Sequence, residues 1–246
     1  MDGTTEPLLA VIGHPIAGNP SQFALERALK AMDLDWRVVS FDVPPDKVSK
    51  ALEGADVLGI RGVLIDATVT GAATDWYRQR VSNAARIDCL FRDEEGGFAG
   101  HNEQQDWLAG TIEQFGQMLG REIGCRVWLG DRDQALISVE GFSEDKHQVP
   151  PDPDEISEAD LIVISDVDGE PAVLDVDDWP ACEDRCLVID LTDDHPQCKA
   201  IEALGYQLVT GQQRRIGVLA QALRRWTGCD PALEVIHDAI EEYLAV

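Results

Sequence analysis

Lysine and long apolar runs are both scarce in this sequence of 246 residues. Only five lysines occur, and 20 Lys and Arg stand against 46 Asp and Glu, so the formal net charge is −26. A surface this acidic repels phosphate backbones and anionic lipids. No apolar run approaches the roughly 18 residues that a membrane-spanning helix needs. The composition therefore predicts neither a nucleic acid nor a membrane as partner, and it leaves the oligomeric state open.

The sequence also lacks a secretion signal and a disulfide pattern. Its first residues (MDGTTEPLLAVIG) carry no basic segment and no long apolar stretch, so no signal peptide is expected. Six cysteines are spread over a chain long enough to fold without disulfides. Reduced thiols and a cytoplasmic location are therefore predicted. Hydrophobic residues make up 44% of the chain, which argues against disorder.

Acidic residues are concentrated in one part of the chain. Between Asp131 and Ala200, 21 acidic residues stand against four basic ones, a local net charge of −17. Both a salt-adapted protein and a solvated acidic face give such a pattern.

Short apolar strands alternate with amphipathic helices, which predicts an α/β fold with parallel pairing. The predicted strands are 8–12, 36–43, 57–65, 87–91, 97–99, 126–129, 135–139, 161–165, 187–191 and 207–209. Two helices are predicted to begin at Ser21, as N-cap, and at Asp46. Further helices are predicted over 72–84, 103–119, 199–204 and 216–226, and a last one from Asp230 onwards. Residues 146–155 are rich in Pro and Asp, which predicts a loop.

Three stretches resemble the shikimate dehydrogenase family. They are VIGHPIAGNPSQFALERAL (11–29), FDVPPDKVSKALEGADVLGIRGV (41–63) and GYQLVTGQQRRIGVLAQALRRWTGCDP (205–231). A fourth, GHNEQQDWL (100–108), stands where the family has G-x-N-T-D. The resemblance implies NADP-linked interconversion of 3-dehydroshikimate and shikimate between two α/β lobes.

The implied organisation has two lobes and four segments. A substrate-binding-like α/β domain is expected over 1–102 and a connecting helix over 103–120. A shortened, degenerate Rossmann-like domain follows over 121–215, and C-terminal helices over 216–246 return to the first domain.

Both catalytic positions that the resemblance implies are changed. The family's N-V-T-x-P-H-K run corresponds to LIDATVT (64–70), so Thr70 stands in the lysine position and Gln104 in the aspartate position of N-T-D. Reduction of a ketone needs a proton donor beside the carbonyl. A threonine hydroxyl does not titrate near neutral pH, so no residue is assigned as catalytic with confidence. His14 and His101 are candidate donors, or simple surface residues.

The substrate-binding positions are partly retained. Asn19 and Ser21 correspond to the family's paired serines, and Asn102 and Gln221 match its Asn and late Gln. Asp88 stands in a further Asn position, where a carboxylate would repel an acidic ligand. Each match has a structural alternative: Ser21 as a helix cap, Asn102 as a turn residue and Gln221 as a solvated helix position.

The cofactor lobe departs further from the resemblance. A dinucleotide site needs a glycine-rich turn after its first strand. Here the strand 126–129 is followed by Gly130-Asp131-Arg132-Asp133-Gln134, with one glycine and two acids. Residues 140–145 (EGFSED) supply no base for a 2′-phosphate. No cofactor is therefore expected, and NADP only if the family's activity is retained.

A last group has zinc-compatible chemistry. Cys182, Cys186, His195 and Cys198 are potential ligands, but their spacing is not that of paired CxxC knuckles, and scattered thiols are the favoured interpretation.

Three hypotheses follow. The first is a shikimate dehydrogenase-like protein without NADP-dependent activity that keeps a cleft for a shikimate-like polyol carboxylate. The second is an active shikimate- or quinate-type dehydrogenase with replaced catalytic residues. The third is a non-catalytic interaction module.

Overall fold

The computed structural model describes residues 6–131, 153–167, 170–192 and 195–245. The chain divides into two compact units, one formed by 1–104 with 216–246 and the other by 105–215. We describe each unit by itself. No helix among the described residues is long and apolar enough to cross a membrane.

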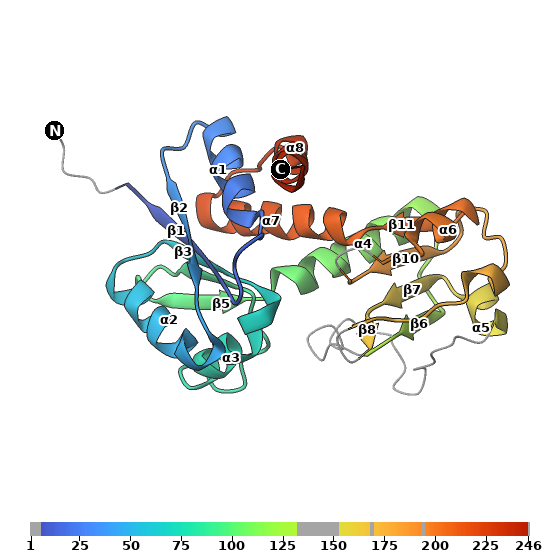
Figure 1. The fold of residues 1–246 in the computed structure, drawn as a ribbon, viewed down its shortest axis with the longest axis horizontal. Helices are drawn as coiled ribbons and strands as arrows, with labels where there is room; N and C mark the ends of the chain where they lie inside the picture. The colour runs from blue at the N-terminus through green and yellow to red at the C-terminus, as the bar shows by residue number, and fades with distance from the viewer. Residues whose placement is uncertain (1–5, 132–152, 168–169, 193–194, 246) are drawn as a thin grey trace. The chain divides into compact units, whose positions relative to one another are not determined.

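The first unit is built on a five-stranded sheet with the order β2-β1-β3-β4-β5 (Figure 1). The strands are β1 (Leu8–Gly13), β2 (Arg37–Asp42), β3 (Gly62–Ile65), β4 (Cys89–Arg92) and β5 (Phe98–His101). The first three pair in parallel, whereas β3, β4 and β5 pair antiparallel. The predicted parallel α/β arrangement and the predicted hairpin are thereby confirmed.

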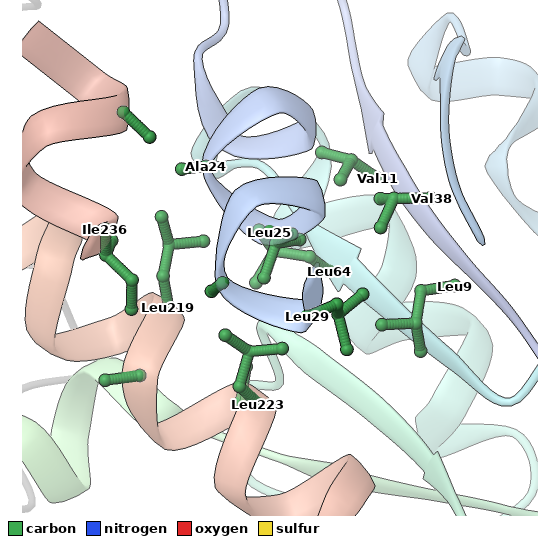
Figure 2. Close-up of a cluster of buried hydrophobic side chains, with 14 of the residues drawn as sticks. Leu9, Val11, Ala24, Leu25, Leu29, Val38, Leu64, Leu219, Leu223 and Ile236 are labelled. Carbon is green, nitrogen blue, oxygen red and sulfur yellow. The ribbon is translucent and has the colours of Figure 1, made fainter. Parts of the chain in front are cut away.

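Helices cover both faces of this sheet. They are α1 (Ser21–Ala31), the 3₁₀ turn η1 (Pro45–Lys47), α2 (Val48–Val57), α3 (Ala67–Arg78), α7 (Gly211–Thr227) and α8 (Leu233–Leu244). Alternation along β1 divides the core, because successive side chains of a strand point to opposite faces. Leu9 and Val11 pack with α1, α7 and α8 (Figure 2), and Ala10 and Ile12 pack with α2 and α3.

Several helix starts differ from the sequence expectation. Helix α2 begins at Val48, because Asp46 lies in the 3₁₀ turn η1. Ser21 is the first residue of α1 and not its N-cap, because its own N–H donates to Asn19 Oδ1 over 2.9 Å. Helix α3 begins at Ala67, five residues earlier than predicted, because the Asp66 carboxylate accepts from the N–H of Thr68 and caps the helix. The last helix begins at Leu233, three residues later than predicted.

Two of the distant motifs meet in the first unit. Gly62 ends the GIRG stretch, and Trp226 begins the WTG stretch on α7. A Cβ on Gly62 would lie 2.2 Å from Trp226 Nε1, so only glycine leaves room for the indole. The same Nε1 donates to the Leu90 carbonyl over 2.9 Å. The glycine and the tryptophan therefore depend on each other.

The second unit contains a four-stranded parallel sheet with the order β11-β10-β7-β6 among its described residues. The strands are β6 (Arg126–Leu129), β7 (Leu161–Ile164), β10 (Leu187–Asp190) and β11 (Gln207–Val209), with the small pair β8 (Asp166–Val167) and β9 (Glu170–Pro171). The helices are α4 (Glu103–Leu119), which starts in the first unit, α5 (Pro153–Glu158), the 3₁₀ turn η2 (Val176–Asp178) and α6 (Cys198–Ala203).

The sequence predictions hold for four strands of this unit and fail at two places. The loop predicted over 146–155 is wrong at its described end, because Pro153 opens α5 and two acids stand in its first turn. Helix α7 begins at Gly211, five residues before the predicted start. The strand predicted over 135–139 lies outside the described residues.

Candidate functional site

Polar side chains gather where the parallel strands of the first unit end. β1 ends at Gly13, β2 at Asp42 and β3 at Ile65, and His14, Asn19 and Asp66 follow or adjoin these ends. The carboxyl ends of parallel strands form the ligand-binding edge of α/β sheets. This edge is the candidate functional site, and we call it the carboxyl edge.

Asp66 is the centre of the hydrogen bonds at the carboxyl edge. Its Oδ2 accepts from Asn19 Nδ2 over 2.9 Å. Its Oδ1 accepts from the N–H of Thr68 over 3.0 Å and from Thr68 Oγ1 over 2.7 Å. Thr68 Oγ1 in turn accepts from the N–H of His14 over 3.0 Å. The loop after β1 and the start of α3 are thus joined through one carboxylate.

His14 and Asp42 form a second polar pair at this edge. The imidazole Nδ1 lies 3.0 Å from Asp42 Oδ1, which also accepts from the N–H of Ile16 over 3.2 Å. The side chains are 42% and 54% exposed, so solvent and small solutes reach both. A carboxylate on Nδ1 orients an imidazole.

Thr70 is not placed for proton transfer. Its hydroxyl donates to the Asp66 carbonyl over 2.9 Å, and the residue is only 1% exposed. The hydroxyl is therefore engaged one turn back along its own helix, as serine and threonine often are. In the other changed position, the backbone N–H of Gln104 donates to Asp88 Oδ2 over 2.9 Å.

Asp88 holds the start of α4. Its Oδ1 accepts from the N–H of Glu103 over 2.7 Å, and its Oδ2 accepts from Gln104. These amides belong to the first turn of the helix, where donors lack partners within the helix and anions are favoured. The carboxylate expected to repel an acidic ligand is therefore committed to a helix terminus.

Desolvation by burial raises the pKa of Asp88 to about 6, against the two amides, which lower it. The unfolded value is near 3.9, so between about pH 4 and 6 the folded state binds more protons than the unfolded state. Stability must then fall as pH rises through that window, by at most about 1.4 kcal/mol per pH unit. We expect urea unfolding at pH 4, 5 and 6 to show this fall in the wild type and to show it reduced in Asp88→Asn. The same slope in both proteins would refute the assignment.

Asn102 and Gln221 flank the same helix start. Asn102 precedes α4 and is 8% exposed, so it is not a solvated turn residue. On α7, Gln221 stands four residues before Arg225, whose guanidinium pairs with the Glu103 carboxylate. Residues four apart share a helix face, which places Gln221 toward the first turn of α4. Gln221 is half-buried, and its Oε1 is buried without a hydrogen-bond partner among the described residues.

The turn after β6 is closed by hydrogen bonds within the second unit. Gly130 has φ +105°, and a Cβ there would lie 2.2 Å from the Ser165 carbonyl oxygen. The N–H of Asp131 donates to the Asp166 carbonyl over 2.8 Å, and Trp128 Nε1 donates to Ser165 Oγ over 2.9 Å. A pyrophosphate needs free amides at this turn. The described part of the turn, which also carries the Asp131 carboxylate, does not fit one. Residues 132–134 and 140–145 lie outside the described residues.

No protein-family model matches the chain. The curated relatives that match it over most of its length include two NADP(+) shikimate dehydrogenases. The protein of Methanothermobacter thermautotrophicus is 22% identical over 95% of each chain, and that of Methanopyrus kandleri is 24% identical over 96% of each. The chain is similar to shikimate dehydrogenases over most of its length.

Solved structures agree on the fold of this shikimate dehydrogenase-like protein. The Thermus thermophilus shikimate 5-dehydrogenase in complex with shikimate superimposes with a TM-score of 0.73 at 20% identity, over 98% of this chain and 100% of that one. The ligand-free 5-ketofructose reductase of a Gluconobacter species gives 0.74 at 17% identity, over 98% and 99%. The fold is therefore that of a substrate-binding domain and a Rossmann-like domain.

The structure does not assemble the zinc site considered for this shikimate dehydrogenase-like protein. Both ring nitrogens of His195 are engaged, Nε2 with the Ala172 carbonyl at 2.9 Å and Nδ1 with the N–H of Gln197 at 3.2 Å. Desolvation by burial raises the pKa of Cys186, which keeps it a thiol and not the thiolate that zinc binds. Among the described residues, these four side chains form no common ligand set: Cys182, Cys186, His195 and Cys198.

Five residues of the carboxyl edge and its support were missed in the sequence: Asp42, Asp66, Thr68, Glu103 and Arg225. Asp42 could have been found, because it lies next to the end of the strand predicted over 36–43 and the ends of parallel strands converge. Glu103 and Arg225 are 122 positions apart, and no local pattern connects them. His101 is half-buried on β5, and no hydrogen bond joins it to His14 among those described.

Proposed function

We propose that this shikimate dehydrogenase-like protein does not carry out NADP-dependent hydride transfer and that it binds a shikimate-like polyol at its carboxyl edge. The observation that carries the first part is the placement of Thr70. In the position where the family resemblance implies the lysine, a buried hydroxyl is bonded to the Asp66 carbonyl. A group so placed neither reaches a ligand nor changes its protonation near neutral pH.

The turn after β6 supports the same proposal. Its first amide is bonded to the Asp166 carbonyl, and the Asp131 carboxylate stands beside it. A dinucleotide would bring at least two phosphate charges to this turn, so binding would require both rupture of that bond and approach of like charges. The acidity of 131–200 opposes the cofactor further.

The second part of the proposal concerns Asn19, Ser21, Asn102 and Gln221. Asn19 is bonded to Asp66, and Ser21 begins α1 beside it. Asn102 immediately precedes α4, and Gln221 stands one turn before Arg225, which pairs with Glu103 of α4. The two groups lie on neighbouring strand ends, because the N–H of Ile65 donates to the Asp88 carbonyl over 2.8 Å. Amides and hydroxyls so arranged are suited to the hydroxyl groups of a polyol.

The test of the first part is an assay with both substrates of the reaction. Without a titratable donor, we expect NADP reduction in the presence of shikimate to be at least about 100-fold slower than with the Methanopyrus kandleri enzyme assayed in parallel. NADPH fluorescence should show no saturable change on titration with the protein. Both measurements need low and high salt, because the net charge of −26 gives a salt-dependent repulsion. Tight NADPH binding together with turnover would contradict the proposal.

A second candidate function is a dehydrogenase that uses other residues, and the His14–Asp42 pair favours it. An exposed imidazole oriented by a carboxylate is a competent proton donor. If turnover is found, His14→Gln should abolish it and Asp42→Asn should lower it, because the imidazole loses the carboxylate that orients it. His237, an exposed histidine beside Asp238, offers the matched control: His237→Gln should leave turnover unchanged.

A cytoplasmic location stays a prediction, which fractionation of the source cells would test.

A further inference from the structure

The chain's own carboxylates take up six donors at the carboxyl edge. These donors are the N–H groups of Ile16, Thr68, Glu103 and Gln104, the Oγ1 of Thr68 and one N–H of Asn19 Nδ2. Each of them donates to Asp42, Asp66 or Asp88. An anionic ligand needs such donors free, since a carboxylate loses strong hydrogen bonds to water when it binds.

Asp66 is the decisive member of this set. Asp88 is committed to α4 and Asp42 faces solvent beside His14, whereas the Asp66 carboxylate lies between Asn19 and Thr68. Asn19 is also fixed from its other end, because its Oδ1 accepts from Ser21. The amide cannot turn to a ligand without losing both bonds. Asp66 therefore takes up one N–H of Asn19 and two donors of Thr68, and it places a negative charge beside the second N–H of Asn19.

An acceptor at the proposed site lacks a partner in the described part of the chain. Gln221 Oε1 is buried without a partner among the described residues, and such an orphaned acceptor costs stability until a donor reaches it. Hydroxyl and ammonium groups supply the donor, and a carboxylate does not. Both the Gln221 oxygen and the donors already bound to carboxylates favour a ligand that donates hydrogen bonds and carries no negative charge.

We propose that the ligand of the carboxyl edge is a polyol without a carboxylate, and that Asp66 is the residue that excludes the acid. This proposal rests on the proposed polyol site and narrows the polyol carboxylate expected from the sequence. The carboxylate of an acidic ligand would lie close to the Asp66 carboxylate, and salt screens repulsion at such short range only weakly. Salt does screen the longer-range repulsion from the net negative charge of the whole protein.

Shikimate and its methyl ester are the matched probes, because they share the ring and hydroxyls and differ in the charge. We expect calorimetric titration of the wild type to give at least tenfold tighter binding of the ester, at both 0.1 M and 1 M KCl. Asp66→Thr keeps a helix cap and frees Asn19 Nδ2, so the preference should fall below threefold. Asp66→Asn keeps the shape without the charge, and it provides the same test if the threonine variant does not fold.

Asp75→Asn is the control for net charge. Asp75 lies on the same helix α3, is 76% exposed and pairs with Arg78 at the surface of the first unit. Its replacement removes one charge and leaves Asn19 and Asp66 untouched, so the preference for the ester should stay. Gln221→Leu should weaken binding of the ester and shikimate about equally, because it removes an acceptor and no charge.

Three results would overturn the proposal: equal affinity of the wild type for both probes, a ratio unchanged by both Asp66 variants, or no binding of either probe by the wild type and the variants. Shikimate binding gained only in the Asp66 variants supports it. The outcome is separate from that of the proposed loss of catalysis. Turnover of shikimate with NADP would refute the proposed loss of catalysis. If no turnover is seen and the Asp66 variants leave the ratio of ester to shikimate affinity unchanged, only the role of Asp66 is refuted.

Discussion

Replacing Arg225 with methionine is expected to lower the free energy of unfolding by about 3–5 kcal/mol at neutral pH. The guanidinium pairs with Glu103 through two bonds, one of them Arg225 Nη2 to Glu103 Oε2 at 3.2 Å. Glu103 is 1% exposed and Arg225 27% exposed, so the carboxylate depends on this partner. Loss of the arginine leaves a buried charge uncompensated. Urea unfolding of the two proteins gives the difference.

Arg224→Met is the matched control for this change. Arg224 is the neighbouring residue on α7, 57% exposed and paired with Asp230 at the surface. Surface ion pairs contribute at most about 1 kcal/mol, so this variant should unfold near the wild type. The double variant Glu103→Met/Arg225→Met should recover most of the loss, since no charge is then left buried. A double variant as unstable as Arg225→Met would show that packing, and not the charge, causes the loss.

Gly62→Ala is expected to destabilise the first unit by about 2–5 kcal/mol, through one methyl group. The new Cβ would meet the Trp226 indole at 2.2 Å, and Trp226 is 5% exposed within the core. The ring has to move, and its bond to the Leu90 carbonyl is then lost. Thermal or urea unfolding followed by tryptophan fluorescence measures both the stability and the displacement of the indole.

Gly71→Ala supplies the control for the same chemical change. Gly71 lies within α3, and a Cβ added there would meet nothing within 4 Å among the described residues, so alanine should stabilise the helix by up to about 1 kcal/mol. Trp226→Phe should relieve Gly62→Ala, because the phenyl ring is smaller than the indole. If the two changes were simply additive, the close approach would not be the cause.

The order of the elements and the family resemblance could be predicted from the sequence because both rest on local patterns. Strand alternation predicted the sheet of the first unit, and the four quoted stretches indicated the family. Helix starts were less predictable. Ser21 has the residue type of a cap, yet Asn19 accepts from the first amide of α1, and Asp66 starts α3 early because its side chain reaches Thr68.

The sequence named candidate site residues but not the hydrogen bonds that these residues make. Asn19, Asn102 and Gln221 were expected at the site, but their partners were not, because hydrogen bonds between residues far apart in sequence leave no local pattern. The interpretation of Asp88 changed for this reason. Its carboxylate was expected to face a ligand, and it accepts instead from the first amides of α4.

By itself, the sequence determined which chemical groups this protein has: no lysine at the position of Thr70, one glycine after β6, and an excess of acids. Residue identity settles these points, since no fold supplies a missing ammonium group. Only the tertiary structure decided which groups are still available to a ligand. Asn19 and Asp66 are 47 positions apart, and their bond exists because parallel strands bring their ends to one edge of the sheet.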